Sequence, residues 1–274
     1  MRFAILAVLI SPAFAADTNV PPADLYGGWL KMYDLRFEEA HVVFGAWKQS
    51  HSTDALGPVS DAAAYLFSEL ARLGVLESEL FIDDARYLNR AALRPDPQLR
   101  AHFDREIERA DGLADTALQA AATDTNALFA KSLIFGLRAD FAGLIEKQNF
   151  VALRYTKQGR PYAARLMAAD PQAYDGYLGG GVENYLLSLR PAPLRALLWL
   201  TGSQVDREKG LEQLRVTAQH GHYLEPFAKL LLAVAAIRDN DRAGARGLLS
   251  ELHKRFPNNP LFLRELNRLS PPSK

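Results

Sequence analysis

The sequence predicts an all-α fold, and three observations support this. Alternating runs of Val, Ile, Thr and Tyr bounded by Asn-Gly or Asp-Gly, which are typical of strands, do not occur. Ala, Leu, Arg and Glu recur instead, with apolar residues at helical spacing. Gly and Pro interrupt these stretches so often that most connections span about two to six residues, which predicts antiparallel neighbouring helices.

The periodic stretches predict about thirteen helices without a flexible linker, and therefore one continuous domain over residues 16–274. Residues 74–98 are the least regular part and could form a loop with one short helix. Pro161 predicts either a bend or a break in the seventh helix, because proline removes a helical hydrogen bond. The expected ranges are 23–34, 36–50, 57–73, 77–91, 96–122, 124–138, 140–169, 171–189, 192–201, 203–220, 222–239, 241–256 and 258–269.

The first fifteen residues, MRFAILAVLISPAFA, predict a secretory signal peptide cleaved after Ala15. Arg2 supplies the positive start, residues 3–10 form the apolar run, and Ala13 and Ala15 are the small residues before the cleavage site. A short buried helix is the alternative. The chain has no cysteine, so it has no site for a lipoprotein anchor, a disulfide or a thiolate. We therefore expect a periplasmic or secreted protein that is not a lipoprotein.

The charge composition argues against nucleic-acid binding. The chain has 32 Lys and Arg and 32 Asp and Glu, and no lysine- or arginine-rich run stands out. Nucleic-acid binding depends on neutralising phosphates, which such a chain is poorly suited to do. After the leader, no segment reaches the roughly 18 consecutive apolar residues of a membrane-spanning helix.

Three stretches, 34–49, 205–221 and 239–260, share a turn with an acidic residue followed by a small residue and a large apolar one four positions later. The small residue lets two helices approach closely, and the large one fills the space beside it. This pattern resembles the tetratricopeptide repeat family, best over residues 222–259 and partially elsewhere. The resemblance implies a right-handed superhelical array of antiparallel helix pairs, an α-solenoid; a generic helical bundle is the alternative. The pairs are Ala40 with Phe44, Gly210 with Leu214, and Ala245 with Leu249.

The glycine-rich stretch YDGYLGGGVENY, residues 174–185, predicts a contact between helices. A phosphate loop would follow a strand, whereas a helix is expected here, and the glycine spacing fits neither a dinucleotide motif nor a Walker loop. Gly176, Gly179 and Gly180 would share one helix face and allow another backbone to come near. In the tetratricopeptide family a Leu-Gly pair makes this contact, and Leu178-Gly179 occupies that place.

No residue pattern predicts catalysis, a cofactor or a metal site. The six histidines form no His-Glu-x-x-His motif, and Gly-x-Ser-x-Gly and Ser-x-x-Lys are missing. One set of polar and aromatic residues on neighbouring predicted helices could line a pocket, although salt bridges between the helices are the simpler explanation. This set is Glu146, Lys147, Arg154, Tyr155, Glu183, Asn184 and Tyr185.

The resemblance implies a groove lined by the first helix of each pair. We therefore expect a non-enzymatic exported scaffold or adaptor that binds a protein or peptide partner. The alternative is a helical module that binds a small solute and accompanies a periplasmic transporter; an unrecognised helical enzyme is a third reading, and self-association is possible. The groove would include Val234 and Ile237, and the candidate binding residues are Trp29, Met32, Tyr33, Arg154, Glu183, Asn184, Tyr185 and Arg238.

Overall fold

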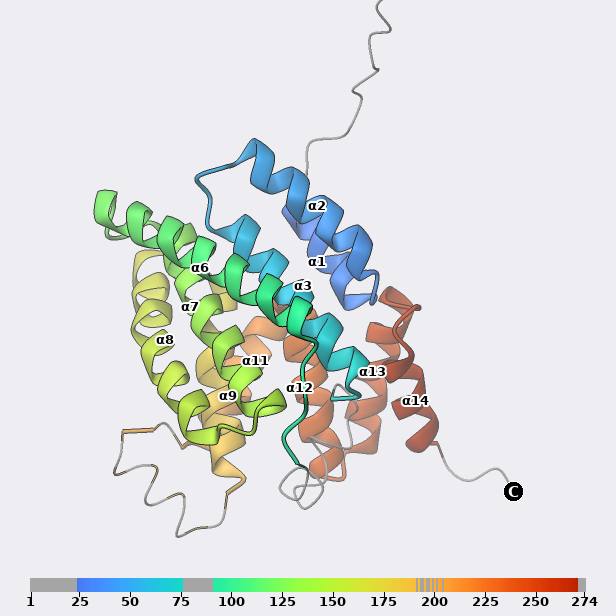
Figure 1. Cartoon of the computed structure of the whole chain (residues 1–274). Coiled ribbons are helices and arrows are strands. Elements are labelled where there is room, and N and C mark those ends of the chain that lie inside the picture. The colour runs from blue at the N-terminus through green and yellow to red at the C-terminus, as the bar shows by residue number, and fades with distance from the viewer. Residues whose placement is uncertain are drawn as a thin grey trace, which may run out of the picture.

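A computed structural model describes residues 24–75, 91–190 and 205–270, with positions 192, 195, 198, 200, 202 and 203 between the last two ranges. Within these residues every regular element is a helix, which confirms the all-α prediction (Figure 1). The predicted signal peptide, the helix expected at 77–91 and most of the one expected at 192–201 lie outside the described residues.

Most observed helices begin and end within a few residues of the predicted bounds. Several begin after an acidic or amide side chain that accepts a hydrogen bond from a backbone N–H of the first turn; these caps are Asp24, Asp96, Asp124, Asp206, Asp241 and Asn259. The α-helices are α1 Leu25–Tyr33, α2 Phe37–Ser50, α3 Leu56–Arg72, α6 Pro97–Ala120, α7 Thr125–Asp140, α8 Asn149–Ala169, α9 Tyr177–Ser188, α11 Arg207–His220, α12 Glu225–Arg238, α13 Arg242–Arg255 and α14 Pro260–Arg268.

The helix expected at 140–169 is interrupted, but not at its proline. After α7 the chain forms a short π-helix, η1 Phe141–Ile145, and α8 starts only at Asn149. Lys147 has a φ of 61°, a left-handed conformation that ends the preceding helix. Pro161 lies inside α8, which continues through it. Of the two alternatives predicted at Pro161, a bend or a break, the break does not occur.

Each helix packs mainly against the next one along the chain, from α1 and α2 to α13 and α14 (Figure 1). The three predicted small–large pairs are buried: Ala40 with Phe44, Gly210 with Leu214, and Ala245 with Leu249. A methyl group on Gly210 would lie 2.5 Å from the backbone nitrogen of Tyr185, so α9 and α11 touch backbone to backbone. The prediction that small residues permit tight helix contacts is confirmed at this position.

The glycine-rich stretch forms a 3-10 turn, η2 Tyr174–Gly176, followed by α9, and no strand precedes it in the described chain. Gly176 packs against side chains of α8, and Gly181 packs against Leu214 of α11. Gly180 meets only the end of the Gln213 side chain, and Gly179 faces open space. Helix contact is thus confirmed for the stretch, but the contact face includes Gly181 and does not include Gly179.

The two ends of the helical succession meet. In Figure 1 the first helices, α1 and α2, lie beside the last ones, α13 and α14. The amide nitrogen of Asn259 donates a hydrogen bond to the carbonyl oxygen of Tyr33 at 3.0 Å. The molecule is therefore closed between its first and last helices. None of the helices in the described parts of the chain combines the length and apolar character needed to cross a membrane.

Candidate functional site

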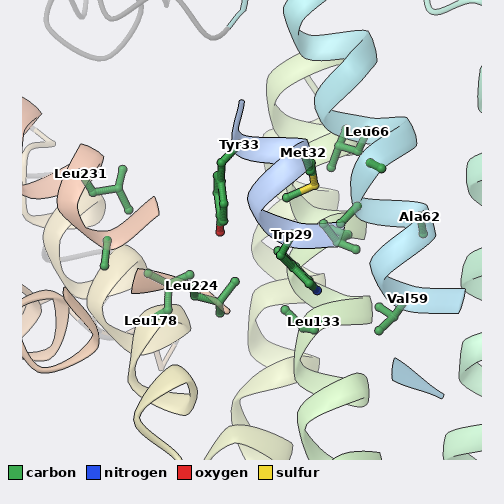
Figure 2. Close-up of a cluster of buried hydrophobic side chains, with 14 of the residues drawn as sticks. Trp29, Met32, Tyr33, Val59, Ala62, Leu66, Leu133, Leu178, Leu224 and Leu231 are labelled. Atoms are coloured by element: carbon green, nitrogen blue, oxygen red, sulfur yellow. The ribbon is translucent and has the colours of Figure 1, made fainter. Parts of the chain in front are cut away.

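Helix α1 occupies the interior of the molecule. Figure 2 shows it between α3, which contributes Val59, Ala62 and Leu66, and the C-terminal helices, which contribute Leu231. Its side chains Leu25, Trp29 and Met32 are at most 2% exposed, and every other residue of α1 is buried or half-buried. Gly28 makes this fit possible on the α2 side, since a methyl group there would lie 2.3 Å from the ring of Phe44.

Aromatic rings join α1 to the turn 221–224, which precedes α12. The ring of Tyr223 lies 5.7 Å from Trp29 and stacks on Phe129 of α7 at 5.8 Å. Tyr26 stacks on His222 at 4.4 Å, with an angle of 20° between the rings. Such aromatic pairs contribute more to stability than the burial of their apolar area alone. The turn thus fills the space between the first helix and the middle of the chain.

Hydrogen bonds satisfy the polar atoms of the buried α1 aromatics. The indole nitrogen of Trp29 donates to the Ser60 hydroxyl at 2.9 Å, and the Tyr33 hydroxyl donates to the Tyr223 carbonyl oxygen at 2.9 Å. Burial first, and the charge of Asp175 second, raise the pKa of Tyr33 well above its ordinary value. The Tyr33 hydroxyl therefore remains a neutral donor near pH 7.

The carboxylate of Asp175 holds the turn 221–224 in place. It accepts hydrogen bonds from the backbone N–H groups of His222, Tyr223 and Leu224, all at 3.0 to 3.1 Å. Burial raises the pKa of this carboxyl group, while the three N–H groups act in the opposite direction. Asp175 therefore positions the residues that contact α1 and the start of α12.

The predicted groove residues of the first helix do not line an open groove. Trp29 and Met32 are buried, Tyr33 is 8% exposed, and Val234 of α12 is 3% exposed. The closure between α1 and the C-terminal helices covers these residues, and their role as contacts for a partner stays a prediction. Arg238, at the end of α12, is half-buried.

The predicted pocket residues are divided between the interior and the surface. Glu183, Asn184 and Tyr185 are at most 5% exposed, whereas Arg154 is exposed and lies 5.9 Å from the ring of its neighbour Tyr155. The structure therefore does not gather Arg154 with the other three in one interior pocket.

The buried residues of α9 bind to neighbouring helices. Glu183 accepts a hydrogen bond from Arg160 of α8 at 2.5 Å, which is a salt bridge between helices. Asn184 donates to Gln213 of α11 and accepts from the backbone of Asp206, both at 3.2 Å. These contacts support the simpler explanation given above, that Glu183 and Asn184 join neighbouring helices.

One cluster of polar side chains was not predicted from the sequence. The Nδ1 atom of His41 and the amine of Lys48 each lie 2.5 Å from one of the two carboxylate oxygens of Asp61, which is 4% exposed. Lys48 also reaches Glu106 at 3.0 Å, and the ring of Tyr65 lies against His41 at 4.1 Å. These residues come from three helices, α2, α3 and α6, so no local spacing could identify them.

The chemistry of this cluster is incomplete for catalysis. A carboxylate bonded to Nδ1 orients an imidazole as in a general base, but catalysis also requires a nucleophile or bound water and groups that stabilise charge. No contact of His41 to a serine, threonine or cysteine side chain is found in the described structure. Within the described residues, no three His, Cys, Asp or Glu side chains are grouped so that they could hold a metal ion.

No protein-family model and no curated protein matches this chain. The fold and the interior contacts define it as an all-α protein of sequentially packed helices, in which the first helix is enclosed by those that follow.

Proposed function

We propose that the chain is a non-enzymatic exported scaffold that binds a protein or peptide partner, built as a tetratricopeptide-like superhelical array. Three features support the array: the sequential packing of helices, the buried small–large pairs, and the backbone contact at Gly210. The leader-like residues 1–15 support export. Mass spectrometry of the protein recovered from the extracytoplasmic fraction tests export, because a mature chain should begin at Ala16.

One observation supports the binding function: the interior of the molecule encloses an aromatic helix, which is α1 itself. Trp29 and Tyr33, four residues apart, insert toward the turn 221–224, and Met32 packs with them in the interior (Figure 2). Recognition of a helix in an apolar groove uses this spacing of anchors. The partner we propose therefore presents a helix with aromatic residues four positions apart, and it binds where α1 lies.

A peptide with the sequence of residues 24–36 tests this proposal. The variant Trp29→Ala loses the largest anchor of α1, and truncation of a buried aromatic costs about 3–5 kcal/mol. Added peptide should bind the full-length variant and raise its melting temperature, while wild-type protein should bind it far more weakly. The matched control is Trp47→Ala, which removes a half-buried tryptophan from α2 and leaves the anchors of α1 in place. A folded Trp29→Ala protein that shows no affinity for the peptide would disprove groove binding.

Two buried polar atoms favour a second candidate function, the binding of a small polar solute. The Nε atom of Arg160 and the hydroxyl of Ser203 are buried without a hydrogen-bond partner. They lie near one another, because Arg160 donates to the carbonyl oxygen of Gly202 at 2.9 Å. Since Glu183 already balances the Arg160 charge, a neutral solute with an acceptor oxygen suits the site better than an anion.

Thermal-shift screening of neutral polyols and amides tests the second function. A positive compound should stabilise the wild-type protein and lose its effect in Ser203→Ala, while Ser250→Ala on α13 should behave like the wild type. If stabilisation survives in Ser203→Ala, the solute binds elsewhere and this candidate fails.

A further inference from the structure

The turn between α1 and α2 holds a leucine in a backbone conformation that its side chain disfavours. Leu35, in the turn 34–36, has a φ of 59°, which is left-handed. Its N–H donates to the carbonyl oxygen of Met32 at 3.0 Å, and the N–H of Arg36 donates to that of Lys31 at 2.9 Å. This is the Schellman cap, in which the left-handed residue is usually glycine, because a Cβ atom crowds the following carbonyl oxygen.

Two other helices end in the same cap with residues that suit it. The left-handed residue is Gly74 after α3, with a φ of 67°, and Asn240 after α12, with a φ of 60°. Both turns have the same pair of hydrogen bonds as the turn after α1. Glycine and asparagine visit the left-handed region readily, whereas leucine does not. Leu35 is half-buried, and among the described residues it is not one of those packed against the hydrophobic core. No core contact therefore offsets its strain.

The sequence of this region is also compatible with one uninterrupted helix. The turn 34–36 contains neither glycine nor proline, and leucine and arginine are good helix formers. Apolar residues recur at alternating spacings of four and three from α1 through the turn into α2, which is the period of a single helical stripe. The stripe keeps its phase across the turn, so residues 25–50 can form one continuous amphipathic helix. Its members are Tyr26, Leu30, Tyr33, Phe37, Ala40, Phe44 and Trp47.

Helix α1 is enclosed by segments that lie far along the chain (Figure 2). The rings of Trp29 and Tyr223 lie 5.7 Å apart, and the amide of Asn259 donates to the carbonyl oxygen of Tyr33 at 3.0 Å. If the turn 34–36 opened, α1 would leave this interior and expose a site shaped for it. A second copy of the chain carries the same helix, so its α1 fits that site by identity of sequence.

We propose that this chain forms a domain-swapped dimer, in which the turn 34–36 opens and α1 of each copy occupies the interior of the other. A short hinge under strain favours such an exchange, and a two-fold axis makes it reciprocal. The contact of Asp34 with Asn258 forms again between the copies, while the strain at both Leu35 residues is released. The site is the one at which the proposed function places a partner helix, but the exchange requires no other protein.

Engineered cysteines test the exchange directly, because the chain has none of its own. Asp34→Cys and Asn258→Cys are made in separate full-length chains, which are unfolded in urea, refolded together and oxidised. The two positions are in contact, with 2.9 Å between a carboxylate oxygen of Asp34 and the backbone nitrogen of Asn258. We expect a disulfide between the two chains, detected by mass spectrometry. The control replaces Asp34→Cys with Gln49→Cys, an exposed position at the other end of α2, and should give no such product.

Two substitutions at the hinge should shift the dimer in opposite directions. Leu35→Gly relieves the closed turn and should raise the dissociation constant of the dimer by about tenfold or more. Leu35→Ile keeps the size and apolar character, but a β-branched residue is less tolerated at positive φ, so this variant should dimerise more strongly. Asn240→Gly changes the equivalent cap of α12 and should leave the dimer unchanged. Sedimentation equilibrium after refolding measures association, and circular dichroism establishes that each variant is folded.

Several results would overturn the proposal. A wild-type chain that stays monomeric after refolding at high concentration excludes the exchange; binding of the peptide 24–36 by the Trp29→Ala variant would in that case leave the proposed function standing. Equal association of Leu35→Gly and Leu35→Ile shows that the turn is not the hinge. A dimer that forms no disulfide between positions 34 and 258 associates through another surface.

Discussion

Asp34 and Asn258 join the beginning of the chain to its end. One carboxylate oxygen of Asp34 accepts the backbone N–H of Asn258 at 2.9 Å, and the other accepts its side-chain amide at 2.6 Å. In an open helical array each repeat contacts only its neighbours. This two-point contact between residues 224 positions apart instead makes the first helical hairpin and the last one parts of a single closed structure.

Removing this contact should lower the stability of the whole protein. Asp34 is 8% exposed, and Asp34→Ala leaves the backbone and side-chain donors of Asn258 without their acceptor. We expect a loss of about 1–3 kcal/mol in the free energy of unfolding, measured by urea denaturation. Glu38→Ala, at an exposed position of α2, should change stability by less than about 0.5 kcal/mol. Equal effects of the two substitutions would contradict the closure.

Two glycine-to-alanine substitutions should have opposite effects. Alanine favours a helix over glycine by about 1 kcal/mol, so Gly247→Ala on α13, where nothing lies within 4 Å of the added methyl group, should stabilise the protein. Gly210→Ala should destabilise the protein by about 1–3 kcal/mol, because the added methyl group would lie 2.5 Å from the backbone nitrogen of Tyr185. Thermal melting of both variants measures the difference. A neutral or stabilising Gly210→Ala would show that α9 and α11 do not touch here.

The stability of the protein should depend on Asp140 between about pH 4 and pH 7. Burial raises the pKa of this carboxyl group from 3.8 to about 7 in the folded protein. Over that interval the folded state keeps a proton that the unfolded state has lost, so the free energy of unfolding falls as pH rises. The loss is at most on the order of a few kcal/mol, because the side chain is only half-buried and partly screened.

The variant Asp140→Asn isolates this contribution, since the amide does not titrate. The difference in unfolding free energy between variant and wild type should increase in favour of the variant from about pH 4 to about pH 7. Urea denaturation at several pH values measures it. A difference that stays constant over the interval would mean that the carboxyl group titrates alike in the folded and unfolded states.

Asp175 should control the local stability of the turn 221–224. Asp175→Ala removes the acceptor of three backbone N–H groups, at a cost of about 1–3 kcal/mol. Hydrogen exchange of the amides at 222–224 should become faster, and α1 should lose protection with them, because Tyr223 packs on Trp29. Asp175→Asn, which keeps one acceptor oxygen, should have a smaller effect. Unchanged exchange in the alanine variant would refute this role.

Local sequence signals predicted most of the helices in the described residues. Apolar periodicity gave their order, and proline and acidic caps gave most of their ends, as at Asp96-Pro97 before α6 and Asn259-Pro260 before α14. The interruption near Lys147 was missed because the left-handed position is a lysine, and because Gly143 lies inside the π-helix and does not mark its end. Strong local signals therefore predicted elements, whereas a backbone irregularity at an ordinary residue such as Lys147 was not predicted.

The candidate site could not be predicted to the same extent. The sequence identified Trp29 and Tyr33 as members of one helix, but their burial depends on Tyr223, which lies 190 residues beyond Tyr33. The contact of His41 with Asp61 likewise joins two helices. Such contacts follow from the closure of the chain on itself, and helical periodicity carries no information about that closure.

The enclosed position of α1 also sets an order of events during synthesis. Helix α1 cannot complete the burial of Trp29 and Tyr33 until the turn at 223 and the asparagine at 259 have followed it. Contacts that span so much of the chain form late in folding. The aromatic residues of α1 consequently stay incompletely buried until nearly the whole chain has been made, and their burial marks the completion of the fold.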